Sequence, residues 1–377
     1  MSAAAADLLT TALHALHEEL GARFVPFAGY AMPVQYPEGL LREHQHVRQA
    51  AGLFDVSHMG QIVVSGAQAA AALETVLPID VLGLGLHRQR YGLLLADDGG
   101  ILDDLMLVRR DHDYLLVVNG ACKHADLAHL QARIGAHCTL TPQFERALLA
   151  LQGPLAAQAL QRLLPQAQEL VFMTGLTALW QGVEVYLTRS GYTGEDGFEM
   201  SLPAEAAPEF ARALLAQPEV KPIGLGARNS LRLEAGLCLY GNDIDRSTTP
   251  VEANLAWAIP KVRRSGGARA GGFAGAARVL GQLEGTQPVT RLRVGLQALQ
   301  RVPVREPAPL HRPDDPDPIG HVTSGLLSPS LDVPIAMGYV PPACATPGTR
   351  LHALVRGKPV PMEVVPLPFV PPRYHRG

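Results

Sequence analysis

The sequence predicts an α+β fold with mainly antiparallel sheets, followed by a region that is almost wholly β. Up to about residue 262, short apolar runs alternate with helical patterns and tight turns, which is typical of sheets with helices on one face. Beyond the Gly- and Ala-rich segment 263–278, strand-like runs predominate. The 37 glycines and 31 prolines, against 5% aromatic residues, favour many turns and short strands over long helices.

Helical spacing begins near the start of the chain. Leu8, Ala12, Leu16 and Leu20 recur about one helical turn apart, and Asp7 is placed to cap this helix. No Lys or Arg precedes Arg23, whereas a secretory signal or a transit peptide needs basic residues. We therefore expect the first folded element of a cytoplasmic protein here.

Two clusters of strands and helices follow. In the first, strands are expected at 61–66, 90–100, 101–108 and 114–120, with helices at 67–77 and 121–135. In the second, a strand is expected at 147–153, a helix near 154–163, a strand–turn–strand at 182–202 and a helix at 227–237. We therefore expect two α+β domains in residues 1–262, divided near residue 140 and able to interleave in sequence. A linker is expected at 263–284 and a C-terminal domain at 285–377. The last domain contains a Pro- and Asp-rich loop at 305–318.

Composition excludes several classes of protein. With 377 residues and 47% apolar content, the chain can bury a large core in two or three domains. A net charge of −3 gives no basic field for nucleic acid or an anionic membrane surface. No apolar run reaches the length of about 18 residues that a membrane span needs.

The four cysteines also limit the classes of protein to which the chain can belong. They are spread along the chain without a C-x-x-C pair, which indicates a reducing compartment, no disulfide framework and no metal site of the zinc type. No G-x-x-x-x-G-K-[ST] loop occurs, and in the segment that begins with Gly224 and Gly226 the third glycine of a dinucleotide fingerprint is replaced by Asn229. We expect neither a metal nor a nucleotide cofactor.

Two adjacent acids, Asp103 and Asp104, stand in the apolar run ILDDLMLV after two glycines. Burying an unpaired carboxylate costs several kcal/mol, roughly, so at least one of them needs a ligand or a protein partner. Neighbouring side chains in a strand point to opposite faces, so the two acids are not expected to share a proton. A pair of structural acids held by backbone N–H groups is an equal alternative, and the pattern does not show which acid is functional.

Glu199 lies in the stretch GYTGEDGFE, where Gly191, Gly194 and Gly197 predict tight turns. A lone acid in an apolar strand needs a donor, and its two oxygens suit a pair of adjacent N–H groups. A glycine-rich hairpin with an internal salt bridge is the alternative.

Arg228 and Arg232 are one turn apart on the helix expected at 227–237. Two cations on one face can hold a carboxylate or a carbonyl group. A surface network of Arg228, Arg232 and Glu234 explains the pattern equally well.

Together these stretches resemble one family, the T-protein of the glycine cleavage system, a folate-dependent aminomethyltransferase. The resemblance lies in the order and combination of segments that are individually weak: 19–37, 52–61, 99–105, 150–154, 191–199, 224–245, 248–257, 322–331, 336–340 and 368–371. It therefore extends nearly from end to end.

The resemblance implies a cloverleaf of three domains around a central folate site, the last domain a small β-barrel. It implies that Asp104 is the catalytic carboxylate, that Glu199 holds the pterin ring, that Arg228 contacts the substrate and that Tyr374 touches the ligand. The implied reaction moves a methylene group from the lipoyl arm of H-protein to tetrahydrofolate and releases ammonia, in a monomer without metal, flavin or membrane. Asn229 departs from the family, which usually has Asp after GAR.

Two other functions share this fold. A folate-dependent demethylase module would be fused to a flavin domain with G-x-G-x-x-G, but this chain begins directly with the folate-type region. A non-catalytic iron–sulfur maturation factor would carry a Lys-Gly-Cys-Tyr type motif, whereas Cys238 lies in GLCLYG and Asp104 is present.

Overall fold

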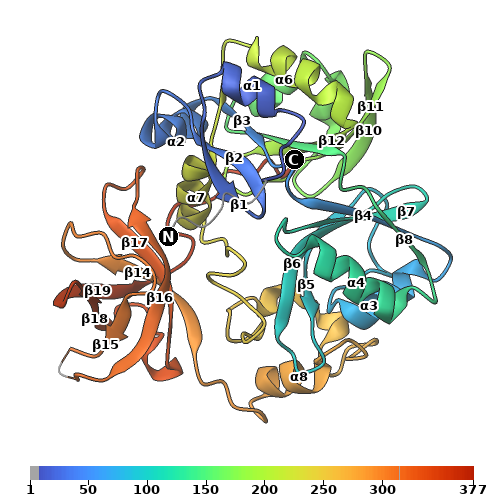
Figure 1. Ribbon diagram of the computed structural model, residues 1–377. Helices are drawn as coiled ribbons and strands as arrows, with labels where there is room; N and C mark the ends of the chain where they lie inside the picture. The colour runs from blue at the N-terminus through green and yellow to red at the C-terminus, as the bar shows by residue number, and fades with distance from the viewer. Residues whose placement is uncertain (1–7, 314) are drawn as a thin grey trace.

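Three structural units surround the centre of the molecule in the computed structural model, which describes residues 8–313 and 315–377 (Figure 1). Two units are built on antiparallel or mostly antiparallel sheets with helices, and the third is a closed barrel of six strands. The α+β prediction with a C-terminal barrel is therefore confirmed.

The first unit is a five-stranded antiparallel sheet in the order β5-β6-β7-β4-β8. Its strands are β4 (Gly60–Ser65), β5 (Gln89–Leu95), β6 (Ile101–Arg109), β7 (Asp113–Val118) and β8 (Thr139–Pro142). The helices α3 (Ala69–Val76) and α4 (Lys123–Ile134) bury their apolar faces against one side of this sheet, where Leu105 and Leu107 of β6 join the core. The opposite face of β6 is directed away from these helices.

The second unit is a six-stranded sheet in the order β10-β11-β12-β9-β3-β13. Its strands are β3 (Ala51–Asp55), β9 (Ala147–Gln152), β10 (Gly175–Trp180), β11 (Val183–Thr188), β12 (Gly197–Leu202) and β13 (Val220–Pro222). The helices α1 (His14–Glu19), α5 (Ala156–Gln161) and α6 (Ala207–Leu215) contribute to its core. Since β3 precedes the whole first sheet in sequence yet pairs with β9, the chain passes from one unit to the other and back.

The helix α7 (Leu225–Glu234) lies between the second unit and the barrel. It packs on α2 (Leu40–Gln49) and on β2 (Tyr30–Gln35), which forms a hairpin with β1 (Arg23–Phe27). On its other side, Leu233 is buried with Ile335 and Met337 of the barrel. This helix therefore carries its polar side chains to the junction of two units.

The barrel closes in the order β14-β17-β16-β15-β18-β19. Its strands are β14 (Leu292–Ala298), β15 (Pro309–His311), β16 (Pro318–Leu327), β17 (Pro334–Val340), β18 (Arg350–Val355) and β19 (Lys358–Val365). The region 305–318 is thus only partly loop, because β15 lies within it and pairs with β16 and β18.

Two other local expectations need correction. The expected linker 263–284 is a folded segment: it contains α8 (Ala276–Glu284), and Phe273 and Val279 are buried with apolar residues of β5 and β6. The first helix begins at His14, because Leu9 instead forms a β-bridge with Tyr30. The expected cap Asp7 lies outside the described residues. No helix in the described part of the chain is long and apolar enough to cross a bilayer.

Candidate active site

The two acids of β6 face opposite sides of their sheet. Burial alternates along the strand: Asp103 is fully buried on the helix-covered side, whereas Asp104 is partly buried on the other side. This matches the prediction from strand periodicity. Beside the acids, the pairing of β5 and β6 is irregular, with Leu94 opposite Asp103 and Leu95 opposite Ile101.

One amide group nevertheless reaches both carboxylates. Asn119 directly follows β7, and its Nδ2 donates to Oδ1 of Asp103 at 2.8 Å and to Oδ1 of Asp104 at 2.9 Å. The backbone N–H of Asn119 donates to the second oxygen of Asp103 at 3.0 Å. Asn119 therefore donates to both oxygens of Asp103 and links this acid to Asp104. No local sequence pattern singles out Asn119.

The second donor to Asp104 comes from the neighbouring strand. The hydroxyl of Tyr91 in β5 donates to Oδ2 of Asp104 at 2.9 Å. The ring of Tyr91 stacks on Trp257, with centroids 5.4 Å apart and planes inclined by 22°. Each oxygen of Asp104 thus has one donor, which fixes the orientation of the carboxyl group.

Burial raises the pKa of Asp104 to about 7, and the negative charge of nearby Asp103 acts in the same direction. The hydrogen bonds from Tyr91 and Asn119 oppose this rise because they stabilise the anion. A carboxyl group with a pKa near neutrality can both accept and release a proton under physiological conditions.

Glu199 lies in β12, opposite Ala150 of β9 and Thr188 of β11. Its only side-chain donor among the described residues is the hydroxyl of Ser190, at 3.4 Å. Burial raises the pKa of Glu199, while the charge of Arg228 lowers it. Most of the acceptor capacity of this carboxylate is therefore unused by the protein.

The glycine-rich turn before Glu199 does contain an internal salt bridge, but Glu199 is not part of it. Arg189 donates to Asp196 through Nε at 3.0 Å, and its Nη2 contacts the other oxygen at 2.5 Å. The hairpin is stabilised without the acid that the sequence singled out.

Arg228 lies on α7 with its guanidinium over the ring of Tyr192, 4.5 Å from the centroid. Its Nη1 is buried and has no hydrogen-bond partner among residues 8–313 and 315–377. The charges of Arg228 and Asp104 both act on the hydroxyl of Tyr192, and the charge of Arg228 acts on Glu199. Arg228 therefore contacts Tyr192, whose hydroxyl donates to the carbonyl of Cys238, while Asp104 acts on Tyr192 and Glu199 on Arg228 through their charges.

Arg232 has a structural role. Only 2% exposed, it donates to Asp243 at 2.6 Å and to Ser324 of the barrel at 2.8 Å. Asn229 accepts from Nε of Arg232 at 2.9 Å, so an amide oxygen serves where the family usually has a carboxylate. The alternative of a surface network is wrong, since Arg232 is buried and the fully buried Glu234 binds Arg48 instead.

Tyr374 lies in the C-terminal segment that follows the barrel. Its ring stacks on Phe172, with centroids 4.0 Å apart and planes inclined by 8°. The adjacent Arg373 donates its backbone N–H to Gly194 at 2.7 Å, which holds the C-terminal segment against the glycine-rich turn. Among the described contacts, none joins Tyr374 to Asp104, Glu199 or Arg228.

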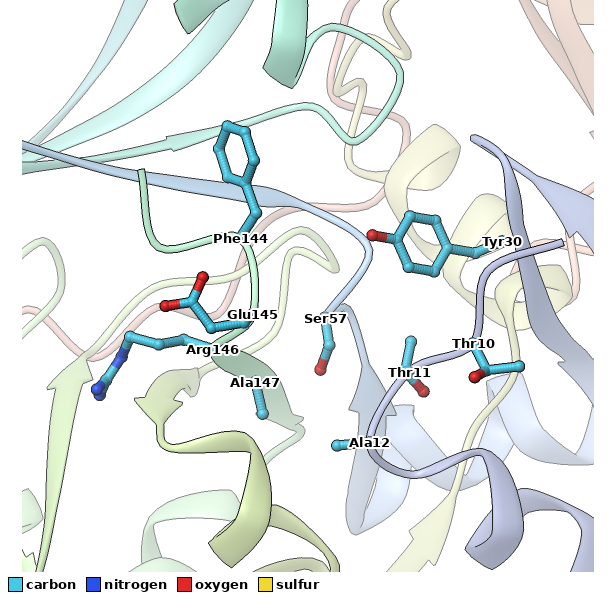
Figure 2. Close-up of a pocket in the computed structure, with 9 residues that line it drawn as sticks. All are labelled: Thr10, Thr11, Ala12, Tyr30, Ser57, Phe144, Glu145, Arg146 and Ala147. Atoms are coloured by element: carbon cyan, nitrogen blue, oxygen red, sulfur yellow. The ribbon is translucent and has the colours of Figure 1, made fainter. Parts of the chain in front are cut away.

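A small cavity of about 90 Å³ lies elsewhere, between segment 10–12 and segment 144–147 (Figure 2). Its polar groups are partly taken by the protein: Thr11 donates to Asp55, and the hydroxyl of Tyr30 accepts from Lys123. None of the four predicted site residues lines it. Within the described residues, no group of His, Cys, Asp and Glu is arranged to hold a metal ion.

Comparison with known proteins agrees with this fold. The family profile described as the GCVT N-terminal domain matches residues 13–263, and that of the glycine cleavage T-protein C-terminal barrel domain matches residues 291–371. The mitochondrial aminomethyltransferase of Gallus gallus is 45% identical over 384 residues, covering 100% of this chain and 96% of the relative. The probable mitochondrial aminomethyltransferase of Schizosaccharomyces pombe is 42% identical, with 100% and 96% covered.

A solved structure is similar throughout. The glycine cleavage system aminomethyltransferase T from Bartonella henselae superposes with a TM-score of 0.92 at 46% identity, covering 98% of this chain and 100% of that one. The fold and these relatives define an enzyme of the aminomethyltransferase class. Within that class, the chain belongs to the glycine cleavage T-protein family.

Proposed function

We propose that this enzyme moves the methylene of an aminomethyl group from the lipoyl arm of an H-protein to tetrahydrofolate and releases ammonia. The observation that carries the proposal is Asp104, a carboxyl group with one donor on each oxygen and a pKa of about 7. Arg228, whose buried Nη1 has no hydrogen-bond partner among the described residues, acts through its charge on Tyr192, as Asp104 does. The family assignment and the names of the relatives support the same reaction.

The residues around Tyr192 fit a reduced pterin. One edge of the pterin ring carries an N–H and an amino group as adjacent donors, which match the open acceptor positions of Glu199. The ring carbonyl is an acceptor, and the buried Nη1 of Arg228 is a donor without a protein partner. When bound, tetrahydrofolate supplies the nitrogen that accepts the methylene.

Asp104 is assigned two tasks. Its anion stabilises the positive charge that develops on the transferred carbon–nitrogen unit, an effect that is stronger away from bulk water. Because its pKa is near neutrality, it can also take up a proton from the attacking nitrogen. Tyr91 and Asn119 keep both oxygens in place during these steps.

Tyr374 is proposed to contact the ligand from the C-terminal side. Its neighbour Arg373 is bonded to Gly194 in the turn that precedes Glu199, which supports this placement. The enzyme is proposed to act as a monomer in the cytoplasm, where its four free cysteines would stay reduced.

Cys238 supports a transferase over an iron–sulfur maturation factor. The residue is 6% exposed, and burial raises the pKa of its thiol to about 12. A thiol that stays protonated is a poor metal ligand and a poor nucleophile.

The proposal is tested by supplying the enzyme with tetrahydrofolate and an H-protein whose lipoyl arm carries the aminomethyl group. Ammonia and methylenetetrahydrofolate should appear in equal amounts. H-protein without the lipoyl group is the control and should give neither product. Absence of both products with the complete substrate set would refute the proposed function.

A further inference from the structure

A third buried acid stands behind the two acids of β6. Asp126 lies in the first turn of α4, is 3% exposed, and its carboxyl group contacts that of Asp103. Its Oδ2 has no hydrogen-bond partner in the described part of the chain. Nothing in the proposed reaction uses this residue.

The partners of Asp103 show which acid of this pair is the anion. Asp103 accepts two hydrogen bonds from Asn119, one from the backbone N–H and one from the side chain. Asp126 and Cys122 also lower the pKa of Asp103 and so oppose the rise that burial causes. Asn119 gives Asp103 two donors, whereas Oδ2 of Asp126 has none in the described part of the chain, so the charge belongs on Asp103 and the proton on Asp126.

We propose that Asp126 is a positioning residue of the active site that keeps its proton at neutral pH and donates it to Asp103. The inference rests on the proposed function, since the residue acts through Asp104. Asp126 donates to Asp103. The side-chain amide of Asn119 donates to both Asp103 and Asp104, so Asp103 anchors the amide that holds Asp104. Asp126 therefore orients the amide that holds one oxygen of the catalytic carboxylate.

The surroundings of Asp126 favour the protonated form. Burial raises its pKa to about 10, and the charges of Asp103 and Asp104 add to the rise. The titratable groups that face Asp126 are Asp103 and Asp104 from β6, Cys122 at the start of α4, and Tyr240 from the segment after α7. All of these are acids, so a second anion at Asp126 would be repelled by its neighbours.

Two variants distinguish a role of Asp126 as a proton donor to Asp103 from a role in packing alone. Asp126→Asn keeps the shape and a donor toward Asp103 but cannot ionise, whereas Asp126→Leu removes the donor. We expect kcat of Asp126→Asn to stay within about twofold of the parent at neutral pH, and that of Asp126→Leu to fall about tenfold. The dissociation constant for tetrahydrofolate should change less than about twofold in both variants, since Asp126 lies on the helix-covered side of the sheet, away from the proposed ligand site.

The pH dependence of kcat is the decisive measurement. As pH approaches about 10, the parent enzyme should lose activity because Asp126 ionises, and Asp126→Asn should lack this loss. Asp97→Asn, an exposed acid in the turn between β5 and β6, is the control and should keep the alkaline loss.

The inference would be overturned if the parent and Asp126→Asn lost activity over the same alkaline pH range. It would also be overturned if kcat at neutral pH fell as much in Asp126→Asn as in Asp126→Leu. If Asp126→Leu does not fold, the comparison of the parent with Asp126→Asn decides alone. Failure of the proposed function would appear differently, as absence of turnover in the parent enzyme.

Discussion

The hydroxyl of Tyr91 donates a hydrogen bond of 2.9 Å to Oδ2 of Asp104 across the β5–β6 pair. The donor and acceptor come from neighbouring strands, so their approach is set by the sheet register and not by a flexible loop. With Asn119 on the other oxygen, this contact turns an acid in an apolar strand into a fixed carboxylate.

Removing the Tyr91 hydroxyl should impair catalysis without removing the ring. Tyr91→Phe is expected to lower kcat about tenfold, because Asp104 loses one of its two donors while the stack on Trp257 remains. Tyr114→Phe, on β7 of the same sheet, should leave kcat unchanged. Equal kcat values for Tyr91→Phe and the parent would show that this hydrogen bond does not matter in the reaction.

The acid limb of the pH–rate profile should report on Asp104. Its pKa is raised to about 7 by burial and by Asp103, so the anion needed for catalysis forms as pH rises through that value and is lost below it. In Tyr91→Phe the anion loses a donor, so the limb should move to higher pH. The measurement is kcat/KM for tetrahydrofolate across the neutral range. A flat profile there would contradict the assignment of this pKa.

Glu199 should control affinity. Glu199→Ala is expected to weaken tetrahydrofolate binding roughly 10- to 100-fold, because two donors of the pterin edge lose their charged acceptor. Glu205→Ala, an exposed acid just after the same strand, is the matched control. Titration of tetrahydrofolate by calorimetry checks both variants, and unchanged affinity in Glu199→Ala would remove Glu199 from the site.

Trp257 should report ligand binding. It is one of two tryptophans, is 64% exposed and stacks on Tyr91, whereas Trp180 is 5% exposed in the core of the second unit. Binding of tetrahydrofolate beside Asp104 is therefore expected to change the tryptophan emission of the parent, and Trp257→Phe should lose most of that change. An undiminished signal in Trp257→Phe would place the ligand away from Tyr91.

The sequence predicted the parts of the site that follow from local patterns. Period-two alternation placed Asp103 and Asp104 on opposite faces of β6, and the glycine-rich turn located Glu199 in a strand. The family resemblance, not the pattern, selected Asp104 over Asp103.

The residues that complete the site were not predictable from local patterns. Tyr91, Asn119 and Asp126 lie on three different elements, and only the strand register and the docking of α4 bring them to the two acids. The same limit applied to Arg232, whose helical spacing with Arg228 indicated a shared role. Tertiary contacts instead direct Arg232 to Ser324 of the barrel, whereas Arg228 lies over the ring of Tyr192.

The most direct test of this account compares Asp104→Asn with the parent in methylene transfer from aminomethyl-lipoyl H-protein to tetrahydrofolate. Turnover should fall at least about 100-fold while tetrahydrofolate affinity stays within about threefold, because the amide keeps the shape of the side chain but carries no charge and takes up no proton. Asp103→Asn should lose less turnover, and the exposed control Asp97→Asn none. Parental turnover in Asp104→Asn would contradict the central claim that this carboxylate carries the chemistry.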